Sequence, residues 1–526
     1  MAGQVTDRAF SADCGTLIDV LRVGGLNRRD KPAVIALDRT VTYGELSDDA
    51  ERLAAMLVAR GVAPGDRVGY LGRGSTDFVS MLFAAALAGC VLVPFNWRLS
   101  APEIAELLED AAPSLLLADQ ELRHLLPEGL ALDIVETRTL APEEWSGPAV
   151  DGAITVSRAE PNDPAWLIYT SGTTGKPKGV MLTHANTMVS VDSVAAAWEI
   201  TEDSVVYVPY PAFHLTGIGW VLKTLRVGGT VIQRPKVDVS DLLDALDRYG
   251  VTNTLLIPTV LSTLVHFPGV TPERLASLRS VVYGVAPITD GLLSRAIELM
   301  PNCRFIHVYG MTESCGQATV LPWAERGPSG QRALSCGRPY PWVELRIVDP
   351  ETGPDKPAGE PGEVWLRGPN VMAGYFGKPE ATAAAITPDG WLRTGDGGCT
   401  DEEGYLVLTD RLTDMIISGG ENIYPAEVEN VLAQHPAVQE VAVVGVPDQH
   451  WGERVRAYVI PVDGCTADAA ELIAFARDRL AHYKCPSSVV FSDMLPKNST
   501  GKVQRSRLRA RPPEPASQPL ATASSR

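Results

Sequence analysis

The chain has 526 residues and a formal net charge of −18, with 45% hydrophobic and 21% charged residues. This length predicts two or more domains, and the composition is typical of a soluble globular protein. The acidic balance argues against a nucleic-acid-binding surface, which needs a basic face, and disfavours anionic membranes. The eight cysteines include no Cys-x-x-Cys pair, and no basic N-terminal region precedes an apolar run. We therefore predict a cytoplasmic protein with reduced thiols and no signal peptide.

The first part of the chain alternates between helix and strand patterns. The patterns predict helices over 16–26, 47–60 and 101–110 and strands over 67–71 and 114–118. Residues 78–95 approach the length of a membrane span, but Gly89 divides them into a buried helix over 78–88 and a buried strand over 90–94. The alternation predicts layered α/β sheets, mostly parallel and covered by helices. The Pro- and Glu-rich stretch 127–163 predicts loops.

Residues 170–179 read TSGTTGKPKG and lie between two apolar runs, 166–169 and 180–183, that predict buried strands. Glycines let backbone N–H groups approach an anion, the hydroxyls add donors, and the two lysines add positive charge. This inventory suits a polyphosphate, although Gly/Ser/Thr content alone is also typical of a flexible surface loop. A P-loop is excluded because Lys176 is followed by Pro177 and a strand, not by Ser or Thr and a helix.

The same string resembles the phosphate-binding loop of the acyl-adenylate-forming enzymes. These are the acyl-CoA and aryl-CoA synthetases, the adenylation domains of peptide synthetases and the luciferases. The resemblance implies that the loop holds the β- and γ-phosphates of ATP. It assigns to the nucleotide Thr170, Ser171, Gly172, Thr173, Thr174, Gly175, Lys176 and Lys178.

Two later segments extend the resemblance. A predicted strand over 205–209 leads into Pro-Ala-Phe-His, so His214 lies at the carboxyl end of a strand, where α/β proteins keep their sites. A lone histidine is more often structural, but the resemblance implies that His214 lies beside the bound acid's carboxylate and positions it. The strand from 281 turns at Gly284, and the resemblance assigns adenine binding to Gly284, Val285 and Ala286.

The motif Tyr309-Gly310-Met311-Thr312-Glu313 follows a predicted strand over 305–308. The resemblance implies that the Tyr309 ring stacks on adenine, that Gly310 and Thr312 contact the nucleotide, and that Glu313 with Thr170 holds Mg²⁺. One carboxylate suffices for this metal, because Mg²⁺ prefers hard oxygen ligands and keeps waters while it bridges phosphates.

A β-rich region begins near Glu363 and contains Trp-Leu-Arg-Thr-Gly-Asp, which ends at Asp396. A single carboxylate can accept strong hydrogen bonds from both ribose hydroxyls. The resemblance assigns this role to Asp396 and a ribose and phosphate contact to Arg411. We predict a domain boundary here, with an AMP-binding and acid-binding domain over 1–410, a small mobile α+β lid over 411–510 and a disordered tail over 511–526.

The resemblance also assigns roles within the lid. Lys502, in a Leu-Pro…Gly-Lys segment, is implied to be the catalytic charge nearest the reacting oxygens. Gly419 and Gly420 are implied to face the CoA thiol after the lid rotates. Thr413 occupies the hinge position, which is usually Asp or Lys. A β-branched residue is stiffer there, so the departure affects the transfer to CoA, which needs the lid to rotate, and not the adenylation.

The resemblance thus implies that ATP adenylates a carboxylic acid and that CoA accepts the acyl group, giving acyl-CoA, AMP and pyrophosphate. Val285 and Val308 stand where many relatives have Gly or Ala, which predicts a short pocket for an aromatic or short acid. Two alternatives within a natural-product pathway stay open: loading of a carrier protein, or activation of nitrite to diazotise an arylamine. The retained Lys502, Glu313 and Asp396 argue against an inactive ligand-binding descendant.

Overall fold

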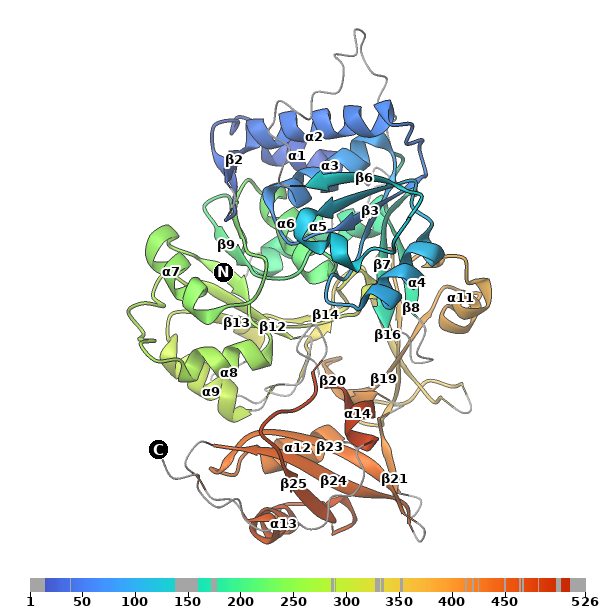
Figure 1. Cartoon of the computed structure of the whole chain (residues 1–526). Coiled ribbons are helices and arrows are strands. Elements are labelled where there is room, and N and C mark those ends of the chain that lie inside the picture. The colour runs from blue at the N-terminus through green and yellow to red at the C-terminus, as the bar shows by residue number, and fades with distance from the viewer. Residues whose placement is uncertain are drawn as a thin grey trace.

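The chain folds into a large body and a smaller C-terminal domain (Figure 1). The computed structural model describes residues 15–37, 39–137, 159–171, 177–284, 288, 290–326, 332, 335–350, 353–411, 414–418, 421–423, 425–448, 451–462, 465, 468–480, 482–497 and 503–510. Three sheets build the body and a fourth builds the C-terminal domain within these ranges. The predicted fold class, layered α/β sheets with a β-rich part and an α+β lid, is confirmed.

The first sheet of the body has nine strands, of which the central six run parallel. In spatial order they are β15 (Arg338–Pro339), β14 (Thr319–Leu321), β13 (Arg304–Tyr309), β12 (Ser280–Gly284), β11 (Asn253–Leu255), β9 (Val205–Val208), β10 (Thr230–Gln233), β1 (Pro32–Ile35) and β2 (Thr40–Thr42). Successive residues of a strand face opposite sides, so Val281 and Tyr283 pack on one helical layer and Val282 on another. The first layer holds α7 (Val239–Tyr249), α8 (Pro258–His266) and α9 (Asp290–Leu299), and α10 (Trp323–Arg326) lies near it.

The second layer is shared with the seven-stranded sheet of the body. It holds α1 (Ile18–Gly24), α2 (Tyr43–Ala59), α3 (Thr76–Ala88), α5 (His184–Ala197) and α6 (Leu215–Arg226). The seven strands are β18 (Gly374–Tyr375), β8 (Pro177–Thr183), β7 (Pro164–Ser171), β4 (Val91–Pro94), β3 (Arg67–Leu71), β5 (Leu115–Asp119) and β6 (Asp133–Thr137). The outer face of this sheet packs on α4 (Ala101–Ala111) and the 3₁₀ turn η1 (Gln120–Leu125).

Burial between two sheets explains the apolar stretch 78–95. Helix α3 is buried along nearly its whole surface, and a helix buried on every side has no polar face. Gly89 ends it with φ 73°, and β4 follows, so the interpretation as a buried helix and strand is confirmed. Within the described ranges, every helix is too short or too polar to reach across a lipid bilayer.

Two sequence predictions about element bounds were wrong. Helix α2 begins at Tyr43, four residues before the predicted start, because Thr42 and Glu45 form a capping box. Strand β6 lies in the stretch predicted as loops. It is an edge strand whose sequence, Asp-Ile-Val-Glu-Thr, has only two adjacent apolar residues, which gives a weak apolar pattern.

The third sheet is antiparallel and made of β16 (Glu344–Val348), β17 (Gly362–Arg367), β19 (Leu392–Thr400) and β20 (Leu406–Arg411), with α11 (Pro379–Ala385) beside it. A turn joins β19 to β20, and in it the backbone N–H of Asp401 donates to the carbonyl of Tyr405 at 3.1 Å.

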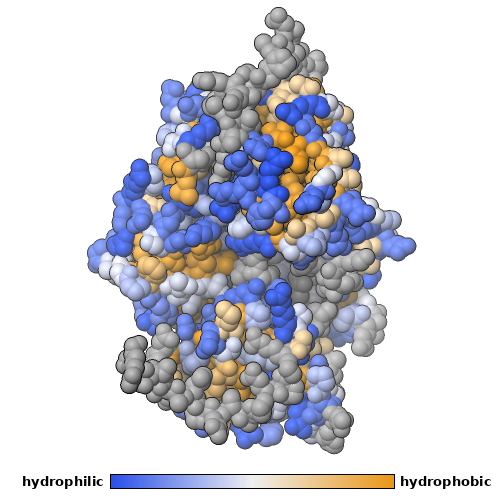
Figure 2. All heavy atoms as spheres, viewed as in Figure 1, coloured by the Kyte–Doolittle hydropathy of each residue, from blue (hydrophilic) through white to orange (hydrophobic). Residues whose placement is uncertain are grey.

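The C-terminal domain packs helices on both faces of its sheet. The strands are β21 (Ile416–Ser418), β22 (Glu421–Ile423), β23 (Val438–Asp448), β24 (Gly452–Pro461) and β25 (Ser488–Phe491). One face packs on α12 (Pro425–Leu432) and α13 (Ala469–Arg477), the other on α14 (Arg505–Arg509), and η3 (His482–Lys484) precedes β25. Figure 2 shows hydrophilic residues over most of the visible surface, with apolar areas mainly on the body.

Thr42→Ala is expected to lower the free energy of unfolding by about 1 kcal/mol. The Thr42 hydroxyl accepts from the backbone N–H of Glu45 at 3.2 Å, and the Glu45 carboxylate accepts from the N–H of Thr42 at 2.8 Å. Alanine leaves the first donor unsatisfied. Urea denaturation measures the loss, and Thr42→Ser serves as the control because it keeps the hydroxyl. Equal losses in the two variants would contradict the capping role.

Candidate active site

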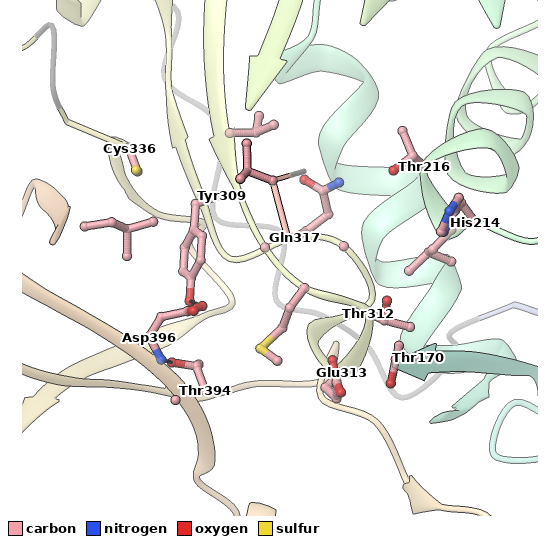
Figure 3. Close-up of a pocket in the computed structure, with 18 of the residues that line it drawn as sticks. Thr170, His214, Thr216, Tyr309, Thr312, Glu313, Gln317, Cys336, Thr394 and Asp396 are labelled. Atoms are coloured by element: carbon pink, nitrogen blue, oxygen red, sulfur yellow. Dashed lines mark hydrogen bonds between the residues drawn. The ribbon is translucent and has the colours of Figure 1, made fainter. Parts of the chain in front are cut away.

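A cleft of about 2280 Å³ lies between the body and the C-terminal domain. Many of the residues predicted from the sequence line it together. They are Thr170, Lys178, His214, Val308, Tyr309, Gly310, Thr312, Glu313 and Asp396. Figure 3 shows several of these side chains pointing into one cavity from β7, β13, β19 and the start of α6. Residues more than 200 positions apart in the chain thus share one wall.

Other predicted residues lie outside the described part of the chain. They are Gly172, Thr173, Thr174, Gly175, Lys176, Val285, Ala286, Thr413, Gly419, Gly420, Lys502 and the tail 511–526, together with the side chains of Ser171 and Arg411. Ser171 pairs with Pro177 across β7 and β8, and Lys497 pairs with Val503. Of these described residues, Pro177, Lys497 and Val503 line the cleft.

Tyr309 and Asp396 form a polar pair in the cleft. The Tyr309 hydroxyl donates to Asp396 Oδ2 at 2.7 Å, and burial together with this carboxylate raises the pKa of Tyr309 well above its usual range. The Asp396 N–H donates to the Thr394 hydroxyl at 3.0 Å, which in turn donates to the Val364 carbonyl at 2.6 Å. The carboxylate is therefore held against a fixed aromatic ring. Arg411 lies opposite Asp396 in the pairing of β19 and β20.

Two glycines permit close backbone approach beside Tyr309. A Cβ on Gly310 would lie 2.5 Å from the backbone of Gly316, so only glycine lets the turn after β13 close. Gly284 has φ 153°, and a Cβ there would lie 2.2 Å from the Val308 carbonyl oxygen. Gly284 thus serves the close pairing of β12 and β13, at the end of the strand predicted to bind adenine.

Glu313 is fixed from two directions. It lies in the 3₁₀ turn η2 (Thr312–Ser314), is 7% exposed, and its Oε1 accepts from the Tyr375 hydroxyl at 3.0 Å. The Tyr375 ring also lies 4.9 Å from Lys178 Nζ. One aromatic side chain therefore separates the predicted metal ligand from a predicted phosphate-binding lysine.

The segment 369–375 joins the three sheets of the body at this point. Asn370 Nδ2 donates to the carbonyls of Ser314 and Gln317 at 2.9 and 2.6 Å, and Met372 N–H donates to the Glu313 carbonyl at 2.9 Å. Its end forms β18, which pairs with β8. Asn186 Nδ2 of α5 donates to the carbonyls of Pro369 and Val371 at 2.7 and 3.0 Å. The position of Glu313 thus depends on a chain segment more than 50 residues away.

His214 caps the N-terminal end of α6 and is half-buried. Burial and the nearby Arg98 lower the pKa of His214 to about 4, so the imidazole is neutral at pH 7. A neutral ring can orient a ligand through hydrogen bonds but carries no charge. A second histidine, His307, also lines the cleft: its Nδ1 donates to the Ser335 carbonyl at 2.8 Å, and its ring stacks on Tyr283 at 4.6 Å.

Beyond His214 the cleft is lined by one face each of α5 and α6. From α6 these residues are Leu215, Thr216, Gly219, Trp220 and Lys223, and from α5 they are Thr187, Ser190 and Val191, with Trp198 just after its end. The spacing of three and four residues places each set on one helical face. The sequence analysis did not identify Lys223, which is 2% exposed and whose pKa burial lowers to about 8.

The chain was compared with known proteins. Residues 24–376 match the model of the AMP-binding enzyme family, and residues 427–502 match the model of the AMP-binding enzyme C-terminal domain. The chain belongs to the AMP-binding enzyme family. This confirms the resemblance to acyl-adenylate-forming enzymes, and the chain is an AMP-forming acid ligase of this family.

Three similar proteins illustrate the range of this family. A feruloyl-CoA synthase of an Amycolatopsis species is 40% identical over 472 residues, 90% of this chain and 94% of that protein. The fatty acid–[acyl-carrier-protein] ligase ScoC of Streptomyces coeruleorubidus is 36% identical over 522 residues, 96% of this chain and 98% of that protein. The crystal structure of ATP-bound MatB from Rhodopseudomonas palustris has a TM-score of 0.84 at 31% identity and covers 94% of this chain and 98% of that chain.

Asn370→Ala is expected to destabilise this AMP-binding enzyme by about 2–4 kcal/mol, because two buried carbonyls lose their donor. It should also weaken nucleotide binding, since the turn that carries Glu313 loses its tether. Thermal unfolding and calorimetric titration with ATP measure the two effects. Asn302→Ala, at an exposed position, is the matched control. Wild-type stability in Asn370→Ala would exclude the tethering role.

Lys223→Met is expected to raise the free energy of unfolding at pH 7 by about 3 kcal/mol. The pKa of Lys223 falls from 10.5 to about 8 on folding, so the unfolded chain binds more protons between these values. The stability of the wild type should therefore rise with pH from about 8 to 10.5, relative to the variant, and the difference should vanish above that window. Urea denaturation at pH 7, 9 and 10.5 measures it, with the exposed Lys236→Met as control. A pH-independent difference would show that Lys223 is not buried as a cation.

Proposed function

We propose that the chain activates an aromatic or short carboxylic acid as its adenylate, using ATP and Mg²⁺, and then transfers the acyl group to CoA. The observation that carries this proposal is the convergence of Thr170, Tyr309, Glu313 and Asp396 on one cleft, with the helical pocket beyond His214 opening from it. The polar residues suit a nucleotide, and the largely apolar helical walls suit the body of an organic acid.

In this proposal the Tyr309 ring receives adenine and the Asp396 carboxylate accepts hydrogen bonds from the ribose. Asp396 is suited to this role because its backbone and its carboxylate are both held in place. Its N–H donates to the Thr394 hydroxyl, and its Oδ2 accepts from the Tyr309 hydroxyl at the cleft wall. The glycine-rich hairpin between β7 and β8 surrounds the phosphates. Its described members Thr170 and Lys178 line the cleft.

Glu313 fits a magnesium ion. It presents a hard carboxylate to the cleft, and no cluster of three or more His, Cys, Asp or Glu that could hold a metal occurs among the described residues. A site with one carboxylate suits Mg²⁺ that takes its other ligands from phosphates and water, with Thr170 as a further oxygen donor. Bound there, Mg²⁺ would offset negative charge on the phosphates.

The first step joins a carboxylate oxygen of the acid to the α-phosphorus of ATP, and the bond to the bridging oxygen of pyrophosphate breaks. Positioning and electrostatic stabilisation supply most of the catalysis in such a transfer. Neutral His214 orients the carboxylate, and Lys502 supplies the charge nearest the reacting oxygens. The lid, which we assign to 411–510, then rotates about Thr413 and brings Gly419 and Gly420 to the thiol. The thiol sulfur attacks the acyl carbon, AMP leaves, and the thiol proton passes to solvent.

A carrier protein is the second candidate acceptor. The similarity to ScoC over 96% of the chain favours it, since that relative is named as an acyl-carrier-protein ligase. Both acceptors present a thiol to the same adenylate, so the first half-reaction is common to them. Nitrite activation differs, because it needs nitrite in place of the carboxylic acid.

Pyrophosphate release tests the proposal with ATP, Mg²⁺ and a panel of aromatic and aliphatic acids, with CoA, with a carrier protein, or with nitrite plus an aminobenzoate. We expect acid-dependent release and a thioester with CoA. Lys502→Ala should lower adenylation by on the order of 10²–10³-fold, while ATP binding stays within about threefold. Lys356→Ala, in the connection between β16 and β17, is the control. Release that ignores every acid but requires nitrite would refute acid activation, and full adenylation by Lys502→Ala would refute the lysine assignment.

A further inference from the structure

Lys223 is a buried cation without an anionic partner in the described structure. It is 2% exposed, and among the described residues its Nζ makes no hydrogen bond or ion pair. Its ammonium group lies 5.0 Å from the centre of the Trp198 ring. A cation–π contact offsets only part of the cost of removing an ammonium group from water, and this cost lowers the pKa of Lys223 to about 8. A buried charge of this kind calls for a bound anion.

Three buried polar groups in the same cleft as Lys223 also lack hydrogen-bond partners in the described structure. Trp220, whose ring lies 4.6 Å from that of Trp198, has a buried Nε1–H without a hydrogen-bond acceptor in the described structure. Ser190 Oγ on α5 and Gln317 Oε1 are buried and unpartnered in the same sense, and all three residues line the cleft with Lys223. Buried polar groups are normally satisfied. Because all three line the same cleft as Lys223, a ligand bound there can complete their hydrogen bonding.

The position of Lys223 Nζ along α6 sets its distance from His214, where the reacting carboxylate of the acid is proposed to lie. A Cβ placed on Gly219 would lie 3.1 Å from Lys223 Nζ, so the lysine side chain folds back by one turn, as helical side chains do. Gly219 follows His214 by five residues, which corresponds to about 7.5 Å along a helix. An acid whose carboxylate lies at His214 therefore reaches Lys223 with a group about one aromatic ring away.

We propose that the physiological acid carries a second oxyanion at the end distant from the reacting carboxylate, and that Lys223 binds it. This rests on the proposed acid activation and names its substrate class. The flat walls of Trp198 and Trp220 suit an aromatic ring between the two acidic ends. A lysine with no binding role would be costly here, because a methionine of similar shape would bury the same stem without a charge.

A matched set of acids tests this inference. Wild-type enzyme is assayed for pyrophosphate release with cinnamate, 4-methylcinnamate, 4-carboxycinnamate, 4-hydroxycinnamate and 4-aminocinnamate, alongside the benzoates with the same substituents. We expect kcat/KM for the carboxy-substituted acid to exceed that for the methyl analogue by roughly 10- to 100-fold, the range for hydrogen bonds to charged groups. The hydroxy-substituted acid should show a smaller gain, because its phenol is un-ionised at neutral pH. The carboxy and hydroxy arms distinguish a carboxylate from a phenolic oxygen. The amino arm should show no gain, because it lacks the oxyanion.

Lys223→Met then separates recognition from general damage. The ratio of kcat/KM for the oxygen-bearing acid to that for its methyl analogue should fall by roughly 10- to 100-fold, and Lys223→Arg should restore part of it. Lys236→Met, an exposed lysine outside the cleft, should leave the ratio unchanged. An unchanged ratio in Lys223→Met, or a wild-type preference for the methyl analogues, would overturn the inference. Absence of release with every acid would instead refute the proposed function.

Discussion

The active-site geometry depends on one stretch of chain, residues 369–375, that connects the three sheets of the body. Asn370 and Met372 hold the turn after β13, β18 extends the sheet that carries the glycine-rich hairpin, and the same stretch leaves directly from β17. Because these bonds are buried, sliding one sheet past another would leave several polar groups unsatisfied. The carboxylate of Glu313 and the ammonium of Lys178 are thereby fixed relative to each other, with Tyr375 between them.

A chain with a net charge of −18 must gather its positive charge locally to bind a nucleotide polyanion. The lid face of the cleft carries Lys497, Arg505, Arg507 and Arg509. Several of these charges are already paired: Arg505 with Glu429 at 2.8 Å, Arg509 with Asp414 at 3.0 Å and Lys497 with Glu440 at 2.7 Å. Such ion pairs hold the side chains in place, and their carboxylates reduce the positive electrostatic potential on this face of the cleft. Among the described residues, Lys178 and Arg507 also line the cleft and add positive charge to it.

The sequence predicted the parts of the site that are contiguous in the chain. The segment Tyr309 to Glu313 and the segment that ends at Asp396 are short motifs of consecutive residues, so they can be identified from the sequence alone. The helix and strand patterns around them predicted the layered fold. Lys223 and Asn370 escaped notice because their roles arise only when α5 packs beside α6 and when three sheets meet. One missed signal was available: Thr42 followed by Glu45 is a capping box, and it marks the true start of α2.

The helical pocket shows how stability and specificity oppose each other in this enzyme. An apolar residue at position 223 would complete the packing of Trp198 and Trp220, and the chain instead keeps a cation there at a cost in folding free energy. We attribute this cost to the ligand-binding role proposed for Lys223. Val308 lines the same cleft as Lys223. Acids without a distal oxyanion would bury Lys223 unpaired, which disfavours them as strongly as any steric barrier would.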